Sequence, residues 1–388
     1  MNQGKTVFSQ LVSHLPRYEF KKCVQRYGGN HKVHRFKCWD QLLAMLFGQY
    51  NKRDSLRDIE HGIRALGKKA YHCGMRAPVS KSNLGYSNQH RDWRIWADFA
   101  QVLIAQTRKL YLQHNPALSE LDQIAYAFDS TTIDLSLKLF PWARFRTASG
   151  AIKLHTQLDL QSLIPTFIKL TEGALHDVNI LDELVFEPGA IYVFDRGYHD
   201  FERLHKIHQQ GSFFITKTKR NFRCEVVHQQ FAGRQHNIID DAYVRLVSFY
   251  PKKNYPDLIR RVEIELEDKS QNMVLMSNHF GLEAKMLAAL YKERWKIELF
   301  FKWIKQHLRI RRFYGVSTNA VLTQIWIAII AYLTLLIVLK KRKIQLSPHT
   351  LLQIVSSALA EKTELHILAK NVANRTTENE NSNQLELW

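Results

Sequence analysis

The hydrophobic pattern of residues 120–310 predicts a sheet followed by a long helix. The apolar runs of strand length are 124–134, 151–160, 163–171, 190–195 and 212–217. A helical pattern at 200–210 separates the last two runs, and another covers 282–308. Residues 220–278 alternate apolar and polar positions, which is typical of half-exposed strands. We therefore expect an α/β core that a mostly β insertion interrupts at 220–278.

The first 120 residues are predicted to form helices. Residues 36–50 have helical apolar spacing, Ser55 is placed to cap a second helix, and a third begins at Ser80 or Ser82 after Pro78. A basic and aromatic segment follows, which contains His90, Arg91, Trp93 and Arg94. Two interpretations fit this region: a reader of DNA that resembles a helix-turn-helix, or an ordinary helical bundle.

The stretch 321–339 is apolar and long enough to cross a membrane. It contains Thr323, Gln324 and Thr334 and is the one such stretch in the sequence, so we expect a buried helix. From Asn371 onward the chain is polar and without periodicity, which predicts a disordered tail. The expected domains are a helical region at 1–120, a core at 121–345, and a C-terminal helix and tail at 346–388.

The composition favours a polyanionic partner. In 388 residues, 55 Lys and Arg stand against 36 Asp and Glu, which gives a formal charge of +19. Charge alone does not separate DNA from RNA or an acidic membrane. The four cysteines are scattered, which argues against a disulfide framework. The spacing of Cys23, His31, His34 and Cys38 matches no common zinc finger, and we expect no zinc there.

The most informative segment is YKERWKIELFFKWIK at 291–305. Its spacing places Tyr291, Arg294, Glu298 and Lys305 within a sector of roughly 60° on one face of a helix. A carboxylate between two cations suits a metal ligand that works beside phosphate. The alternative is a solvated face with i,i+4 ion pairs.

A metal site for phosphoryl transfer needs further carboxylates at strand ends. Asp129, in FDSTTIDL, is an acid inside an apolar strand, where it needs a partner or a metal. Asp195, in VFDRGYHDF, stands where a short apolar run stops, before a Gly turn. Each also fits a turn or capping role, and Asp134, Asp159 and Asp177 are rivals for the same position.

The chain resembles the DDE transposases of the insertion-sequence family 4. Tyr291, Arg294, Glu298 and Lys305 match that family's Y-x-x-R-x-x-x-E-x-x-x-x-x-x-K signature without a gap. The segments around Asp129 and Asp195, and residues 142–160, resemble its other blocks, so that the likeness extends over about 120–335. It implies an RNase H-like catalytic core with an all-α N-terminal DNA-binding region. It also implies that Asp129, Asp195 and Glu298 hold two Mg²⁺ ions, for which Mn²⁺ substitutes.

The resemblance further implies a bacterial enzyme that cuts and rejoins DNA. Its partners would be double-stranded transposon ends and target DNA, bound by a homodimer in the cytoplasm, at the nucleoid, without a membrane. Tyr291, Arg294, Lys305 and Arg196 would contact phosphates. Family members use the insertion to handle the DNA end, some with an aromatic ring stacked on a flipped base. Here the insertion lacks Trp, and the substitutes are Phe249, Tyr250 and Tyr255.

Three alternatives stay open. One is a transposase-derived DNA-binding protein that has lost catalysis. Another is an RNase H-like nuclease that cuts without joining. The third is a membrane-anchored protein built around 321–339.

Overall fold

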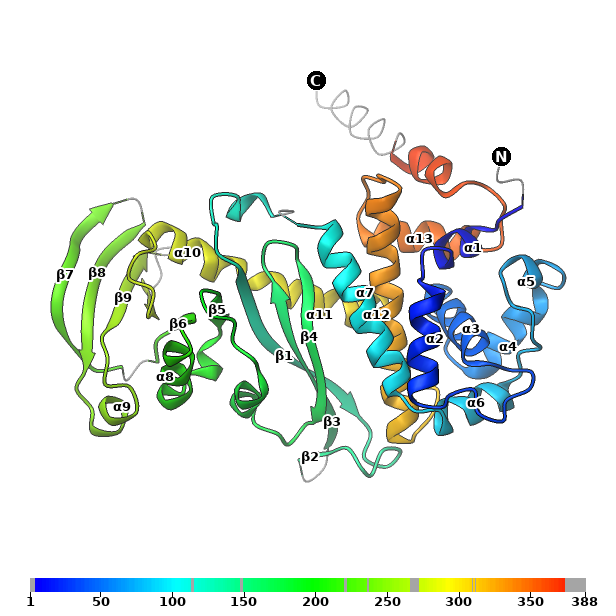
Figure 1. The fold of residues 1–388 in the computed structure, drawn as a ribbon, viewed down its shortest axis with the longest axis horizontal. Coiled ribbons are helices and arrows are strands. Elements are labelled where there is room, and N and C mark those ends of the chain that lie inside the picture. The colour runs from blue at the N-terminus through cyan, green and yellow to red at the C-terminus, as the bar shows by residue number, and fades with distance from the viewer. Residues whose placement is uncertain are drawn as a thin grey trace, which may run out of the picture. The chain divides into compact units, whose positions relative to one another are not determined.

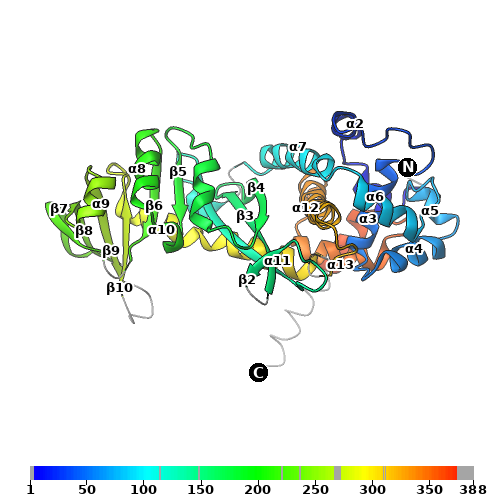
Figure 2. The ribbon, with the colours of Figure 1, turned by 90° about the horizontal axis from the view of Figure 1, so that it is seen from below.

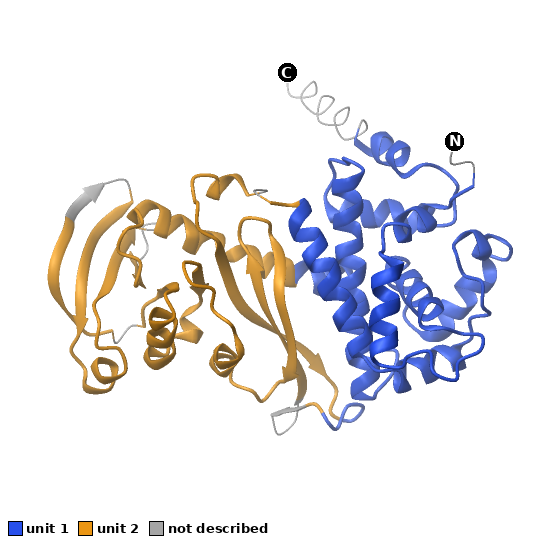
Figure 3. Ribbon diagram, viewed as in Figure 1, with its two compact units in different colours: residues 1–110, 138–142, 302–388 blue, residues 111–137, 143–301 orange. Residues whose placement is uncertain are grey.

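The computed structural model describes residues 4–112, 115–146, 149–219, 222–235, 237–265, 272–308, 310 and 312–373. Its residues group into two compact units (Figure 3). The helical unit comprises residues 1–110, 138–142 and 302–388, and the sheet unit comprises residues 111–137 and 143–301. The predicted tail lies outside the described residues from position 374 onward.

The helical unit is built from α-helices that precede and follow the sheet unit along the sequence. They are α1 (Val7–Val12), α2 (Arg17–Arg26), α3 (Cys38–Tyr50), α4 (Leu56–Ala65), α5 (Lys69–His72), α6 (Lys81–His90), α7 (Arg94–Leu110), α12 (Thr318–Lys341) and α13 (Pro348–Ala358). The expected capping residues are present: Ser55 accepts a hydrogen bond from the Asp58 amide, and Ser80 accepts one from the Asn83 amide. The helical N-terminal region is thus confirmed.

Helix α12 is the core of the helical unit. It is long and apolar enough to cross a membrane, yet 94% of its most apolar window is buried within the protein. It packs against α3, α6, α7 and α13, which surround it in Figures 1 and 2. The Tyr50 hydroxyl of α3 donates to the Ala331 carbonyl at 3.2 Å. The apolar stretch 321–339 is therefore covered by neighbouring helices, as the sequence predicts.

The sheet unit contains a ten-stranded mixed sheet. Its strands are β1 (Ala125–Leu135), β2 (Arg144–Arg146), β3 (Ser149–Asp159), β4 (Ile164–Glu172), β5 (Ile191–Phe194), β6 (Phe213–Lys217), β7 (Cys224–Gln235), β8 (Ile238–Leu246), β9 (Ile259–Glu265) and β10 (Asn272–Ser277). Its short helices are η1 (Pro116–Leu118), η2 (Asp177–Glu183), η3 (Arg196–Tyr198), α8 (Phe201–Gln209) and α9 (Phe249–Asn254). Helix α10 (Ala284–Glu293) follows β10, and α11 (Trp295–His307) runs from the sheet unit into the helical unit.

The strand order identifies the core. β4, β3 and β1 pair antiparallel, and β5 and β6 then continue the sheet parallel to β1. The order β4-β3-β1-β5-β6 is that of an RNase H-like core, so the predicted fold class is confirmed. β10, β9, β8 and β7 extend the same sheet beyond β6. The expected β insertion at 220–278 is therefore present, with α9 as the one helix among the residues described there.

Both faces of the sheet are covered. Figure 2 shows α8 on one side and α10 on the other, and both contact β6. Under α8, the aromatic side chains of Tyr126, Phe128, Tyr192 and Phe194 form a buried cluster with Phe214. These rings belong to the central strands β1, β5 and β6, so the core of the sheet unit lies between these strands and α8.

The predicted single helix at 282–308 is wrong in one respect. The chain forms α10 and α11 instead, with Arg294 between them. The Arg294 amide still bonds to the Leu290 carbonyl, but the Ile297 amide bonds three residues back to the Arg294 carbonyl. This tighter turn interrupts the regular helix without changing its course greatly, because Arg294 keeps α-helical dihedral angles.

Candidate active site

Asp129 and Asp195 lie side by side where two parallel strands leave the core. In the register of β1 and β5, Phe128 is opposite Phe194, and both are fully buried. The next residue on each strand is the aspartate, which is partly exposed. The carboxyl ends of parallel strands are where open α/β sheets place their sites. The two carboxylates therefore lie at equivalent positions on neighbouring strands, where β5 ends and β1 continues beside β3.

Arg294 forms ion pairs with both Asp129 and Glu298, and so brings Glu298 to the same site. The Arg294 guanidinium donates from Nη1 to Asp129 Oδ2 at 3.1 Å and from Nη2 to Glu298 Oε1 at 2.8 Å. Its side chain is only 12% exposed, against 19% for Asp129 and 33% for Glu298. Both ion pairs are thus shielded from solvent more than surface pairs are. Arg294 thus links Asp129 on β1 to Glu298 on α11.

The surroundings of Asp129 change the acidity of its carboxyl group. Burial raises the pKa of its carboxyl to about 6, and the negative charges of Asp195 and Glu298 act in the same direction. The Ser130 amide, which donates to Asp129 Oδ1 at 2.8 Å, and the Arg294 charge oppose this rise. Three acidic groups therefore share one electrostatic environment around Arg294.

Two of the remaining predicted contact residues, Tyr291 and Arg196, lie beside this cluster. Tyr291 has its ring 6.0 Å from the Arg294 guanidinium, and burial raises the pKa of its hydroxyl. Arg196, at the start of η3, is exposed and lines an open pocket of about 430 Å³ with Asp195, Gly197 and Lys219. Lys305 lies two turns beyond Glu298 on α11, in the part of that helix that groups with the helical unit.

The rival acids occupy other positions. Asp134 is exposed, five residues further along β1. Asp159 is buried, and its Oδ1 accepts from the amides of Gln161 and Ser162 in the turn between β3 and β4. Asp177 accepts from the Ser130 hydroxyl at 2.8 Å and pairs with Lys153 at 3.1 Å. Asp159 is engaged in a turn, and Asp177 neutralises a lysine.

The structure adds two residues that the sequence did not single out. Lys219 lines the pocket beside Asp195, and its ammonium donates to the His199 carbonyl at 3.1 Å. Tyr198 packs edge-on against Phe128, the residue before Asp129, with ring centroids 5.3 Å apart. Lys219 has a signal in the sequence: it follows β6, the parallel neighbour of β5, at the same edge as Asp195.

The donor set can be compared with what a divalent metal requires. Carboxylate oxygens are the ligands that Mg²⁺ prefers, so Asp129, Asp195 and Glu298 fit it in chemistry. Within the described part of the chain, no group of three or more His, Cys, Asp or Glu side chains is gathered closely enough to hold an ion as it stands. Arg294 provides the positive charge between two of these acids instead.

The candidate aromatic residues of the insertion differ in exposure. Tyr255 is buried, and its hydroxyl bonds to His208 Nδ1 at 2.8 Å, so its ring belongs to the core. Phe249 and Tyr250 are 76% and 74% exposed on α9. Only these two present a ring surface to solvent.

Comparison with known families identifies the class of protein. A family model described as "Transposase DDE domain" matches residues 120–334, more than half of the chain. The chain belongs to this family of DDE transposases, in agreement with the RNase H-like sheet. A second model, described as a domain of unknown function (DUF4372), matches residues 3–76 of the helical unit.

Named relatives agree with this assignment. "Putative transposase y4zB" of Sinorhizobium fredii is 33% identical over 286 residues, 73% of this chain and 78% of that protein. "Probable transposase for insertion sequence element IS5377" of Geobacillus stearothermophilus is 28% identical over 208 residues, 53% of this chain and 54% of that protein. "Putative transposase for insertion sequence element IS4SA" of Synechocystis is 25% identical over 262 residues, 66% and 71% of the two chains.

Proposed function

We propose that this transposase binds the terminal inverted repeats of an insertion sequence and performs Mg²⁺-dependent cleavage and strand transfer. One observation carries the proposal. Asp129 and Asp195 occupy equivalent positions on the adjacent parallel strands β1 and β5, directly after the paired residues Phe128 and Phe194, and Arg294 forms ion pairs with both Asp129 and Glu298. Cleavage and joining share one chemistry, in which an oxygen attacks phosphorus while the bond from phosphorus to the leaving 3′ oxygen breaks.

The acids and the basic residues would have different roles. Asp129, Asp195 and Glu298 would hold two Mg²⁺ ions, or Mn²⁺ in their place. Such ions, when bound, lower the pKa of the attacking water or 3′ hydroxyl and stabilise the leaving oxygen. Arg294, Arg196 and Lys305 would bind phosphate oxygens beside the scissile bond, and Tyr291 would donate from its hydroxyl.

Several further features are part of the proposal. The substrates would be double-stranded transposon ends and target DNA. Two copies of the chain would assemble on two ends as a homodimer, in the bacterial cytoplasm at the nucleoid. The helical unit would contribute recognition of the terminal repeat. A core that binds phosphates alone does not discriminate between sequences.

Charge-removing substitutions test the catalytic assignment. Asp129→Asn, Asp195→Asn and Glu298→Gln should each abolish cleavage of end DNA in Mg²⁺, by a factor of at least about 10³, since each removes a metal ligand. Binding of the same DNA, measured by fluorescence anisotropy, should persist. Asp134→Asn is the matched control, because Asp134 is an exposed acid on the same strand.

The outcomes separate the alternatives. Near wild-type cleavage by one of the three variants would remove that residue from the catalytic set. A wild-type protein that binds ends but never cuts would be the inactive, transposase-derived DNA-binding protein. Cleavage without joining of a 3′ end to a target duplex would indicate a nuclease.

A further inference from the structure

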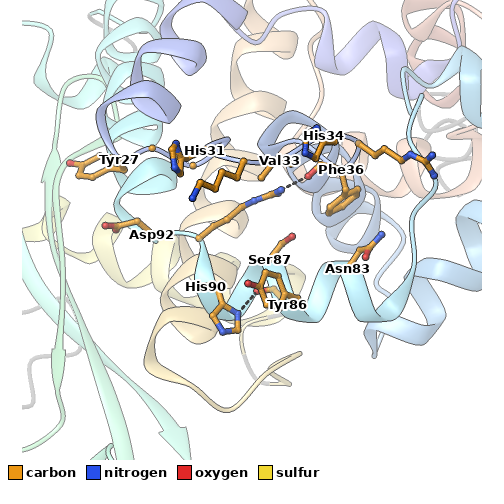
Figure 4. Close-up of a pocket in the computed structure, with 15 residues that line it drawn as sticks. Tyr27, His31, Val33, His34, Phe36, Asn83, Tyr86, Ser87, His90 and Asp92 are labelled. Carbon is orange, nitrogen blue, oxygen red and sulfur yellow. Dashed lines mark hydrogen bonds between the residues drawn. The ribbon is translucent and has the colours of Figure 1, made fainter.

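The helical unit contains a pocket of about 810 Å³ that lies away from the acidic cluster in sequence and belongs to one unit alone. One wall is the loop between α2 and α3, residues 27–36, and the other is the second half of α6 with the turn after it, residues 83–92. Figure 4 shows His31, His34 and Phe36 on the loop side and Tyr86, Ser87 and His90 on the α6 side. The volume is within the range of pockets that hold a ligand the size of a nucleotide.

The pocket is strongly basic. Lys32, Arg35 and Arg91 line it, together with three histidines, and Asp92 is the one acid among its lining residues. Asp92 is already neutralised, because the Arg94 guanidinium donates to both of its carboxylate oxygens at 2.6–3.1 Å. The ligand that such a lining attracts is an anion.

Among these cations, Arg91 gives the strongest indication that the pocket binds an anion. It is 9% exposed, and its guanidinium bonds to Gln41 Oε1 at 2.8 Å and to the Phe36 carbonyl, which are both neutral acceptors. Throughout the described residues it has no ion pair within 4 Å; Asp40 acts on it only through the longer-range field. A buried cation without a carboxylate partner is costly, and an anion in the pocket would offset that cost.

The loop wall holds a second unusual feature. Lys32 has φ of 54°, in the left-handed region that favours glycine, and its side chain is exposed at the pocket. A lysine at this position therefore carries a backbone penalty that glycine would not. Lys52 and Lys343 share this conformation, so it makes glycine a tolerated substitution and does not by itself indicate a ligand.

The opposite wall is held rigidly. Asn319, in the first turn of α12, donates to the carbonyls of Asn88 and Arg91 at 2.9 and 2.6 Å, and its own oxygen accepts from the Trp93 amide. The junction of α6 and α7 is thus fixed to the core helix of its unit. On the same wall the rings of Tyr86 and His90 stack at 4.1 Å, and Tyr86 is 68% exposed. The pocket is preorganised on this side.

We propose that this pocket binds a phosphodiester segment of duplex DNA, with Lys32, Arg35 and Arg91 facing the phosphate. The proposal rests on the proposed function, because it assigns to the helical unit a defined contact with the DNA that the transposase acts on. The overall charge of +19 favours such a polyanion. A phosphate contact positions DNA without reading its sequence. We therefore expect the pocket to strengthen binding to terminal-repeat and unrelated duplexes equally.

A pair of lysine-to-glycine substitutions in the full-length protein tests this. Lys32→Gly removes the pocket charge and relieves the left-handed backbone, so the thermal unfolding midpoint should not fall. Lys343→Gly is the matched control, since Lys343 is also exposed, has φ of 53°, and lies outside the pocket. In anisotropy titrations with both duplexes, Lys32→Gly should weaken binding about fivefold to tenfold at 0.1 M salt. It should also lower the slope of log K against log salt by about one unit.

Chemical protection provides a second measurement that does not depend on substitution. Carbethoxylation by diethyl pyrocarbonate, followed by mass spectrometry, should show that duplex DNA protects His31, His34 and His90. His61 and His72, which are exposed elsewhere in the same unit, should keep reacting. Equal reactivity of the pocket histidines with and without DNA would overturn the proposal.

The titrations have three other decisive outcomes. Equal losses for Lys32→Gly and Lys343→Gly would mean that overall charge, not this pocket, binds DNA. Unchanged affinity and slope for Lys32→Gly would also overturn the pocket assignment while leaving the transposase proposal intact. A wild-type protein that binds neither duplex would contradict the proposed function itself.

Discussion

Arg294 has a role at the residue scale that its place in a signature does not reveal. It is the counter-charge of Asp129 and Glu298, and it is less exposed than either. A metal that binds the same carboxylates must compete with the guanidinium for their oxygens. In the proposed function, a metal ion bound by these acids would leave Arg294 able to bind a phosphate oxygen.

This competition is measurable by replacing the arginine. Arg294→Ala should lower the stability of the metal-free protein by about 3 kcal/mol, because it leaves partly buried acids without their partner. The thermal upshift on adding Mn²⁺ should become larger than in the wild type, since no guanidinium then competes. Unfolding followed by circular dichroism with and without Mn²⁺ gives both quantities.

A control variant separates this effect from general destabilisation. Arg203 also pairs with two acids, Asp182 and Asp200, at 2.6 and 3.1 Å. Arg203→Ala should destabilise the protein and leave the Mn²⁺ upshift as it is in the wild type. The same upshift in Arg294→Ala and Arg203→Ala would show that Arg294 does not compete with metal.

Some residues of the site were predictable from the sequence, and others were not. Asp129 stands out because it is an acid inside an apolar strand, and Asp195 because it directly follows one; both are local patterns. The pairing of Arg294 with Asp129 joins positions 165 residues apart, and helical spacing specifies a face but not its partner. Arg91 was expected in a basic segment; its burial against Gln41 and Phe36 depends on tertiary packing.

At the element scale, close helix packing in the helical unit depends on a glycine. Gly48 lies within α3, where a Cβ would approach Ile59 of α4 to 2.5 Å at Cδ1 and 2.9 Å at Cγ1. Gly85 lies within α6, where a Cβ would meet its nearest atom, Leu56 Cδ1, at an ordinary 3.6 Å. Both glycines lie inside helices, but of the two only Gly85 has room for a Cβ atom.

Alanine at the two positions should therefore have opposite effects. Gly85→Ala should stabilise the protein by about 0.5–1 kcal/mol through helix propensity. Gly48→Ala gains the same propensity but forces α3 and α4 apart, and overpacking of about 1–3 kcal/mol leaves it less stable than the wild type. Denaturant unfolding of both full-length variants measures the difference. A stabilised Gly48→Ala would mean that Ile59 adjusts freely.

Secondary structure was more predictable than the grouping of elements. The apolar runs at 124–134 and 190–195 correspond closely to β1 and β5, because a short continuous apolar run is typical of a strand that is buried on both faces. The interruption at Arg294 has no proline or glycine to mark it. In sequence, α12 follows the sheet unit, whereas its packing partners α3 and α7 precede it. Periodicity identifies a buried face of a helix but not the face against which it packs.

At the scale of the whole molecule, the stability of the chain should depend on pH through buried histidines in both units. Burial lowers the pKa of His14, His155 and His199 to about 4. Each folded-state pKa lies below the unfolded value of about 6.5, so the unfolded chain takes up protons first as the pH falls. The stability that these groups contribute is present above pH 6.5 and is lost between about 6.5 and 4.

Asp129 acts in the opposite direction over part of this range. Its folded pKa of about 6 exceeds the ordinary value of 3.8, so the folded state keeps a proton that the unfolded chain releases. Its ionisation therefore costs stability as the pH rises from about 4 to 6, and acidification recovers that cost. The net dependence of stability on pH is the difference between the histidine contributions and that of Asp129. A variant is therefore needed to isolate the contribution of one histidine.

His155 is the best choice, because its side chain is fully buried within β3 and its Nε2 bonds to the Thr171 hydroxyl at 2.9 Å. Between pH 7 and pH 5 it should account for a loss of about 2 kcal/mol. His155→Gln cannot titrate, so its unfolding midpoint should fall less steeply with acid than that of the wild type, whatever its stability at pH 7. Parallel profiles for the two proteins over this range would show that His155 is not held neutral by burial.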